Sequence, residues 1–133
     1  MKILLVDDIT AMREIVKQML IHEIFSTESV KKNKILEGIT PSIMEAKNGY
    51  EAIEIFKISK PDIVILDMHM PNITGIEVSK KILEISKNTQ ITMLTSDKES
   101  SVVVEAFRAG VRHFIIKPIT SEKLIEIVFD FLK

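Results

Sequence analysis

The chain has 133 residues with a formal net charge of −1, and 46% of its residues are hydrophobic while 28% are charged. These values are typical of one globular domain and exclude a disordered or fibrous protein. Because the charge is near zero and the one dense basic patch, residues 31–34, is short, we expect no nucleic-acid partner and no membrane partner. The chain has no cysteine, no apolar run long enough to span a bilayer and no signal peptide, so we expect a cytoplasmic protein.

Short apolar segments alternate with helical patterns along the chain. The first strand is predicted at 3–6, and it precedes a helix on which four apolar residues recur at helical spacing: Met12, Ile15, Val16 and Met19. The later predicted elements are strands at 42–46, 63–66, 90–94 and 113–116, and helices at 50–58, around 78–85, around 103–107 and at 121–133. Five strand–helix units of this length predict an α/β fold with a parallel sheet and helices on both faces.

Residues 26–41 interrupt this alternation between the first helix and the second strand. Connections in such units usually run to 2–6 residues, and this one is far longer. Its residues 31–38 could form a short helix that stops at Gly38. We expect a single domain, residues 1–133, with an insertion at about 26–41. Whether the insertion is a tolerated surface loop or a contact surface stays open.

Polar side chains follow four of the five predicted strands. Asp7 and Asp8 follow the first strand and Asp67 follows the third. Thr95 follows the fourth strand and Lys117 follows the fifth. Because ligands of open α/β sheets bind at the carboxyl ends of the strands, we expect three carboxylates, a hydroxyl and an ammonium to meet at one edge.

These residue types point to phosphoryl chemistry. Three neighbouring carboxylates repel one another unless a cation joins them, and oxygen donors without His or Cys suit Mg²⁺. A lysine beside such a site indicates a second anion, for which phosphate is the obvious choice. One carboxylate could then attack phosphorus and form an aspartyl phosphate, which the metal and the lysine would stabilise. The simpler alternative for the first pair is that Asp8 only caps the helix that follows it.

In their order and spacing, these residues resemble the receiver domain of two-component response regulators. The matching segments are VDD at 6–8, the D-x-x-M-P-x-x-x-G pattern at 67–75, LTS at 94–96 and KP at 117–118. Each motif alone is weak, but four in order, each after the correct strand, are specific. The resemblance covers nearly all of the chain apart from the insertion. It implies a flavodoxin-like (βα)5 fold, a doubly wound parallel sheet with strand order 2-1-3-4-5.

The resemblance also implies how the acidic residues act. Asp67 would accept a phosphoryl group from a sensor histidine kinase or a phosphotransfer protein. Asp8 and Asp67 would bind Mg²⁺ directly, together with the backbone carbonyl of His69. Asp7 would contribute through a water molecule.

The remaining motif residues would form the switch. Lys117 would contact the phosphoryl group, and its bond to Pro118 would be cis. Thr95 would hydrogen-bond the phosphoryl group and move on activation together with Phe114, which here has no hydroxyl. The side chains of His69 and Asp97 stand at positions that affect the lifetime of the phosphoryl group in the family.

The predicted closing helix carries two apolar stripes, which is more than a helix on a protein surface needs. The first stripe is Leu124, Ile127, Val128 and Phe131, and the second is Ile125, Phe129 and Leu132. Such a helix is either deeply packed or meets a partner, and both interpretations stay open. In receivers, the fourth helix, fifth strand and fifth helix form the surface on which a downstream target or a second receiver docks, so a homodimer through this surface is one expectation.

The implied function is a stand-alone phosphoacceptor switch of the chemotaxis-regulator kind, in chemotaxis or a phosphorelay. It is not a classical enzyme, because it would catalyse only its own phosphotransfer and autodephosphorylation. Since the sequence ends at Lys133, we expect no DNA-binding or enzymatic output domain after it.

Three other functions compete with this one. A Mg²⁺-dependent phosphatase resembling the haloacid dehalogenase family would need D-x-D-x-T after the first strand, where this chain has DDIT. A flavin-binding module would need a loop rich in glycine and hydroxyls there, and two aspartates would repel the flavin phosphate. A receiver-like adaptor that is never phosphorylated would be expected to lack Asp67 or Lys117, and both are present.

Overall fold

The computed structural model describes residues 1–96 and 100–133. Its strands are β1 (Lys2–Val6), β2 (Ser42–Ala46), β3 (Ile63–Asp67), β4 (Gln90–Thr95) and β5 (His113–Ile116). Its α-helices are α1 (Thr10–Gln18), α2 (Thr27–Lys32), α3 (Gly49–Ser59), α4 (Gly75–Ile85), α5 (Ser100–Arg108) and α6 (Ser121–Leu132). Two further segments are a π-helical stretch, η1 (Met19–Ile24), and a 3₁₀ turn, η2 (Lys34–Leu36).

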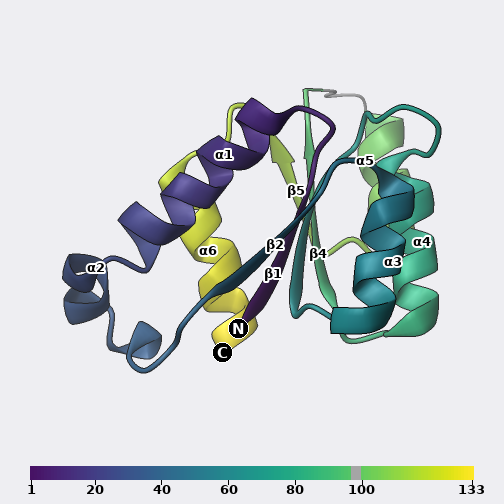
Figure 1. Ribbon diagram of the computed structural model, residues 1–133. Coiled ribbons are helices and arrows are strands. Elements are labelled where there is room, and N and C mark those ends of the chain that lie inside the picture. The colour runs from purple at the N-terminus through teal and green to yellow at the C-terminus, as the bar shows by residue number, and fades with distance from the viewer. Residues whose placement is uncertain (97–99) are drawn as a thin grey trace.

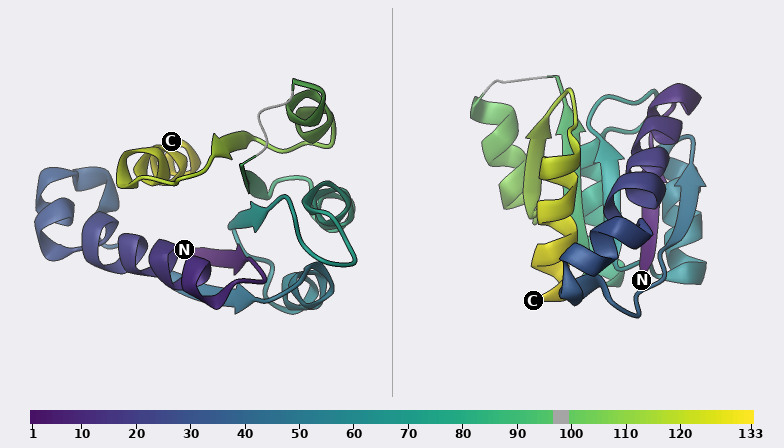
Figure 2. Two further views of the ribbon diagram at one scale, coloured as in Figure 1. Left: turned by 90° about the horizontal axis from the view of Figure 1, so that it is seen from above. Right: turned by 90° about the vertical axis from the view of Figure 1, so that its left-hand side faces the viewer.

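All five strands are parallel and lie in the order β2-β1-β3-β4-β5. The predicted flavodoxin-like fold and its strand order are therefore confirmed. Helices α1 and α6 cover one face of the sheet and α3, α4 and α5 cover the other, as Figure 1 shows from the side and Figure 2 from above. In the described part of the chain, no helix has the length and apolarity needed to cross a membrane.

The core has two layers, one on each face of the sheet. Along β1, Leu4 and Val6 belong to the cluster under α3, α4 and α5, while Ile3 and Leu5 belong to the cluster under α1 and α6. This alternation follows from the two-residue period of a strand. The inner strand β3 is buried on both faces throughout, which explains its unbroken apolar run.

The first helix is longer than the apolar pattern predicts. It continues from α1 through η1 to Ile24 without a break in the helical backbone. Val16, Leu20 and Ile24 are buried against the sheet, spaced four residues apart. Ile15, which the pattern places with the apolar face, is 47% exposed.

The insertion contains a helix, but not at the predicted residues 31–38. The hydroxyl of Ser26 accepts a hydrogen bond from the Ser29 N–H at 3.2 Å, and this cap starts α2 at Thr27. The helix ends before Asn33, whose φ of −123° and ψ of 87° are not helical, and η2 follows. The predicted bounds are therefore wrong, although Gly38, with φ of +77°, does mark a turn.

The closing helix α6 is packed on both of its apolar stripes. Leu124, Ile127 and Val128 are buried, whereas the second stripe is half-buried against the same core cluster. The π-helical segment η1 lies against α6, and the Ser121 hydroxyl donates a hydrogen bond to the Glu23 carboxylate between them. The extension of the first helix therefore helps to explain why α6 carries a second apolar stripe.

Candidate functional site

Three carboxylates gather at the carboxyl end of the sheet. The oxygens of Asp7, Asp8 and Asp67 lie within 4.8 Å of one another. Asp7 and Asp67 are only 6% and 4% exposed, whereas Asp8 is exposed. The structure thus brings together the three acids that the sequence places after two separate strands.

The pairing of β1 with β3 explains this meeting. Val6 stands opposite Leu66 in the parallel register, so the next residues, Asp7 and Asp67, lie beside each other at the carboxyl ends of β1 and β3. The Asp7 N–H donates to the Ala46 carbonyl of β2 at 3.2 Å, which continues the sheet pairing one residue past β1. The positions of the two buried acids are therefore fixed by backbone hydrogen bonds.

Asp7 shapes the loop that leads into α1. Its carboxylate accepts a hydrogen bond from the Ile9 N–H at 2.9 Å, and its backbone carbonyl accepts one from the Arg13 guanidinium. Ile9, not Asp8, is the N-cap residue of α1, and no side chain among the described residues caps that helix. The alternative that Asp8 serves as a helix cap is therefore wrong.

Burial also raises the pKa of the Asp7 carboxyl above its ordinary value of 3.8. The hydrogen bond from Ile9 and the charge of Lys117 lower this pKa, while the charges of Asp67 and Asp8 raise it further. The folded chain thus disfavours the ionised form of the Asp7 carboxyl.

Lys117 provides the positive charge of the cluster. Its Nζ lies 3.5 Å from Asp67 Oδ2, while the other oxygen, Asp67 Oδ1, accepts a hydrogen bond from the His69 N–H at 3.2 Å. The Lys117 N–H donates to the Thr95 carbonyl at 2.8 Å, which fixes the end of β5 beside the end of β4. The bond between Lys117 and Pro118 is cis, as the resemblance implies.

Gly75 permits α4 to start against the strand that carries Asp67. A Cβ at this position would lie 2.8 Å from the Asp67 carbonyl oxygen and 2.7 Å from Met93 Sδ. The Gly75 N–H donates to the Met68 carbonyl at 3.0 Å. Any larger residue would push the helix away from the loop that follows Asp67.

The two predicted switch residues lie on adjacent strands. Thr95 is fully buried at the end of β4. Phe114 is half-buried on β5, and its ring centroid lies 6.4 Å from that of Phe107 on α5. His69 is exposed beside the acidic cluster, and Asp97 lies outside the described residues.

One contact near the site could not be read from the sequence. Besides holding the Asp7 carbonyl, the Arg13 Nε lies 3.2 Å from a Glu45 carboxylate oxygen, and the Arg13 side chain is only 12% exposed. Arg13 has no motif around it, and Glu45 lies 32 residues further along the chain. A contact of this kind follows from the pairing of β1 with β2 and from no local signal.

The donor set fits a hard divalent cation. All three side chains offer carboxylate oxygens, two of them are buried, and their oxygens are close enough to share one ion. A cation there would also relieve the mutual repulsion that disfavours the charged acids. The positive charge of Lys117 can balance the negative charge of a further anion beside Asp67.

Comparison with known proteins identifies the family of the chain. The profile of the response regulator receiver domain matches residues 33–129. The chain is 32% identical over 127 residues to the chemotaxis protein CheY of Bacillus subtilis, covering 96% of this chain and 93% of that protein. It is 34% identical over 125 residues to the chemotaxis protein CheY of Thermotoga maritima, covering 94% and 92%.

Solved structures agree in fold. The Vibrio cholerae chemotaxis protein CheY4 superposes with a TM-score of 0.78 at 26% identity, covering 98% of this chain and 97% of that one. CheY in a Borrelia burgdorferi complex with CheX, BeF3 and Mg²⁺ gives a TM-score of 0.79 at 24% identity, covering 100% and 90%. The fold, the gathered acids and the matches over most of the chain lead to one conclusion: this chain belongs to the response regulator receiver family and is similar to CheY.

Proposed function

We propose that this chain is a stand-alone receiver that accepts a phosphoryl group on Asp67 from a histidine kinase or a phosphotransfer protein of the cytoplasm. The observation that carries the proposal is the position of Asp67 between two acids and a lysine. Its carboxylate is buried, lies within 4.8 Å of the other two acids, and has Lys117 Nζ at 3.5 Å. Residues 1–133 form a single receiver domain in this proposal, with residues 26–41 as an insertion.

In the proposed reaction, an Asp67 oxygen forms a bond to the phosphorus of a phosphohistidine. The phosphorus–nitrogen bond breaks, and the imidazole leaves with the electron pair and takes up a proton. Autodephosphorylation is the attack of water on the aspartyl phosphate, which releases phosphate and restores the carboxylate. The proposed chemistry is limited to these two steps on the protein's own carboxylate, so the protein would act as a phosphoacceptor and not as a classical enzyme.

Mg²⁺ is the proposed cofactor. Asp8, Asp67 and the backbone carbonyl of His69 would hold the ion, with Asp7 acting through a water molecule. When bound, the metal supplies positive charge that neutralises the transferring phosphoryl group. Lys117 stabilises the same group from its own side, and the buried setting of Asp67 strengthens that interaction.

The proposed output is a change in the surface formed by α5, β5 and α6, which correspond to the fourth helix, fifth strand and fifth helix expected from the sequence. Thr95 and Phe114 would move together and link the site to this surface. A groove of about 440 Å³ runs along it, lined in part by Phe107, Phe114 and Ile127. A downstream protein, or a second copy of the chain, would dock there, and chemotaxis is the proposed pathway.

The test is the intact mass of the protein after incubation with acetyl phosphate, with Mg²⁺ or with a chelator. We expect a gain of one phosphoryl group that requires Mg²⁺ and is absent in Asp67→Asn. Glu54→Gln, which removes an exposed carboxylate on α3, is the matched control and should label like the unaltered chain. Lys117→Ala should keep Mg²⁺ binding, measured by calorimetry, because a cation at the three acids needs no lysine ligand.

Two results would contradict the proposal. Labelling that persists in Asp67→Asn would place the acceptor elsewhere. Mg²⁺ binding without any labelling, from acetyl phosphate or from a phosphorylated histidine donor, would favour an adaptor that is never phosphorylated.

A further inference from the structure

The loop that leads from β1 into α1 is held by hydrogen bonds on either side of Asp8. Before it, the Asp7 N–H donates to the Ala46 carbonyl at 3.2 Å, and the Asp7 carboxylate accepts from the Ile9 N–H at 2.9 Å. After it, the Ile9 carbonyl accepts a hydrogen bond from the Arg13 N–H at 3.3 Å. Asp8 itself is exposed, so core packing does not fix it as it fixes the two buried acids.

The Arg13 side chain closes this loop. Its Nη1 donates a hydrogen bond to the Asp7 carbonyl, and its Nη2 donates one to the Thr10 hydroxyl at 3.4 Å. Its Nε lies 3.2 Å from Glu45 Oε1 on β2, and only 12% of the side chain is exposed. Because the guanidinium is planar and its donors form a rigid fork, it joins the edge strand β2 to residues on both sides of Asp8.

The hydrogen bond to the Asp7 carbonyl bears directly on Asp8. A peptide group is planar, so the direction of the Asp7 carbonyl sets the positions of the Asp8 nitrogen and Cα. In the proposed function, Asp8 is the exposed acid that binds Mg²⁺ directly. If its backbone were free, the cost of ordering it would oppose the binding of the metal.

We propose that Arg13 is a positioning residue of the Mg²⁺ site, which holds the peptide between Asp7 and Asp8 in place through the Asp7 carbonyl. The effect on the metal rests on the proposed function, whereas the hold on Asp8 is a property of the metal-free chain. A positive charge near the site repels Mg²⁺, while a fixed ligand helps to bind it. The charge and the hydrogen bonds of Arg13 therefore act in opposite directions, and the sign of its effect identifies its role.

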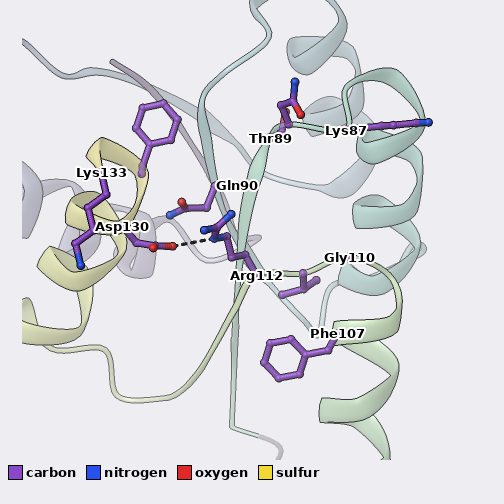
Figure 3. A pocket seen from close by; sticks show the side chains of 11 residues that line it. Lys87, Thr89, Gln90, Phe107, Gly110, Arg112, Asp130 and Lys133 are labelled. Atoms are coloured by element: carbon purple, nitrogen blue, oxygen red, sulfur yellow. Dashed lines mark hydrogen bonds and ion pairs between the residues drawn. The ribbon is translucent and has the colours of Figure 1, made fainter.

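Two other basic residues provide matched controls. Lys17, one turn further along α1, lies 3.4 Å from the other carboxylate oxygen of Glu45, so Lys17→Met removes a charge from the same partner. Arg112 precedes β5 at the opposite end of the sheet, where its Nε lies 2.8 Å from Asp130 Oδ2. That oxygen also lies 3.2 Å from His113 Nε2. Figure 3 shows Arg112 and Asp130 meeting across the space between α6 and the start of β5, so Arg112→Met removes an arginine and its ion pair away from the acids.

The first measurement is the backbone order parameter of the Asp8 N–H, obtained from nitrogen relaxation in the metal-free protein. We expect a value of about 0.85 in the unaltered chain and below about 0.6 in Arg13→Met, which keeps the apolar stem of the side chain but removes its donors. Lys17→Met and Arg112→Met should not change it. A flexible Asp8 in the unaltered chain would overturn the proposal, and that result requires no variant to fold.

The second measurement is the affinity for Mg²⁺, by calorimetry on the folded variants. Arg13→Met should bind about 10-fold more weakly although it has lost a positive charge, because the group that orients a ligand is gone. Lys17→Met should bind as tightly as the unaltered chain or more tightly, and Arg112→Met should bind equally.

The outcomes separate this inference from the proposed function. Unchanged or tighter binding in Arg13→Met would show that only its charge matters and would overturn the positioning role alone. An unaltered chain that does not bind Mg²⁺ would contradict the proposed cofactor, and this inference with it.

Discussion

The carboxyl edge of the sheet and the segment 19–41 are built in opposite ways. At the edge, two acids are buried beside each other and the pKa of Asp7 is raised, so the folded chain bears a penalty there. In the segment 19–41, Leu20, Ile24 and Leu36 are almost fully buried and add to the core under α6. The carboxyl edge of the sheet is thus arranged to bind a ligand and to react with it, whereas the segment 19–41 stabilises the molecule.

The largest effect on stability is expected from Leu36→Ala in the insertion. Leu36 is fully buried, and its truncation should lower the free energy of unfolding by about 2–5 kcal/mol because it leaves a cavity. Ile35→Ala is the matched control, since Ile35 is 42% exposed and should cost about 0.5 kcal/mol or less. Urea unfolding measures both. Equal costs would mean that the insertion is only a surface loop.

Alanine substitutions at two glycines, one in each region, should have different effects. Gly75→Ala should cost about 1–3 kcal/mol and also reduce phosphoryl labelling, because its Cβ would press on the Asp67 carbonyl. Gly38→Ala in the insertion has open space around its Cβ but a φ of +77°, so it should cost about 1 kcal/mol and leave labelling unchanged. Unfolding and labelling of both variants are compared. Unchanged labelling in a folded Gly75→Ala would contradict the role given to this glycine.

The smallest effect, and the only gain in stability, is expected from Asp7→Asn. Because the folded-state pKa of Asp7 is raised, the folded chain holds more protons than the unfolded chain between 3.8 and that pKa, and stability falls as the pH rises through this window. Asparagine has no charge to lose and can still accept the Ile9 hydrogen bond. At neutral pH without metal, Asp7→Asn should therefore melt at a higher temperature.

Two further measurements sharpen this prediction. Below pH 3.8 the difference between Asp7→Asn and the unaltered chain should vanish, since Asp7 is then neutral in both states. Added Mg²⁺ should stabilise the unaltered chain more than Asp7→Asn. A lower melting temperature for Asp7→Asn at neutral pH would show that the acid stabilises the fold and would break the contrast between the two regions.

The two regions also differ in how far the sequence predicts them. At the edge, the predicted order of parallel strands is enough to bring Asp7 and Asp67 together, since each stands one register step past a pair of opposite residues. Gly75 stands in the sequence only as part of the D-x-x-M-P-x-x-x-G pattern, and its close approach to the Asp67 carbonyl is seen only in the structure. The positions of Asp7 and Asp67 depend on strand ends, and strand ends follow from local apolar runs.

The segment 19–41 depends on contacts that no local pattern contains. The spacing of Val16, Leu20 and Ile24 does continue a helical face and would have extended the first helix past Met19. The burial of Leu36 in the core cluster under α1 and α6 has no such signal, because nothing near it in sequence distinguishes it from the exposed Ile35. The pairing of His113 with Asp130 is hidden for the same reason, since it joins β5 to the last turn of α6.

The central claim is that Asp67, among three adjacent acids, is the phosphoacceptor. The most direct measurement is to treat the labelled protein with borohydride, which reduces an aspartyl phosphate to homoserine, and to locate homoserine by peptide sequencing in a mass spectrometer. We predict homoserine at position 67, with Asp7 and Asp8 unchanged. Homoserine at position 7 or 8 would contradict the account, because those acids would then react instead of holding the metal.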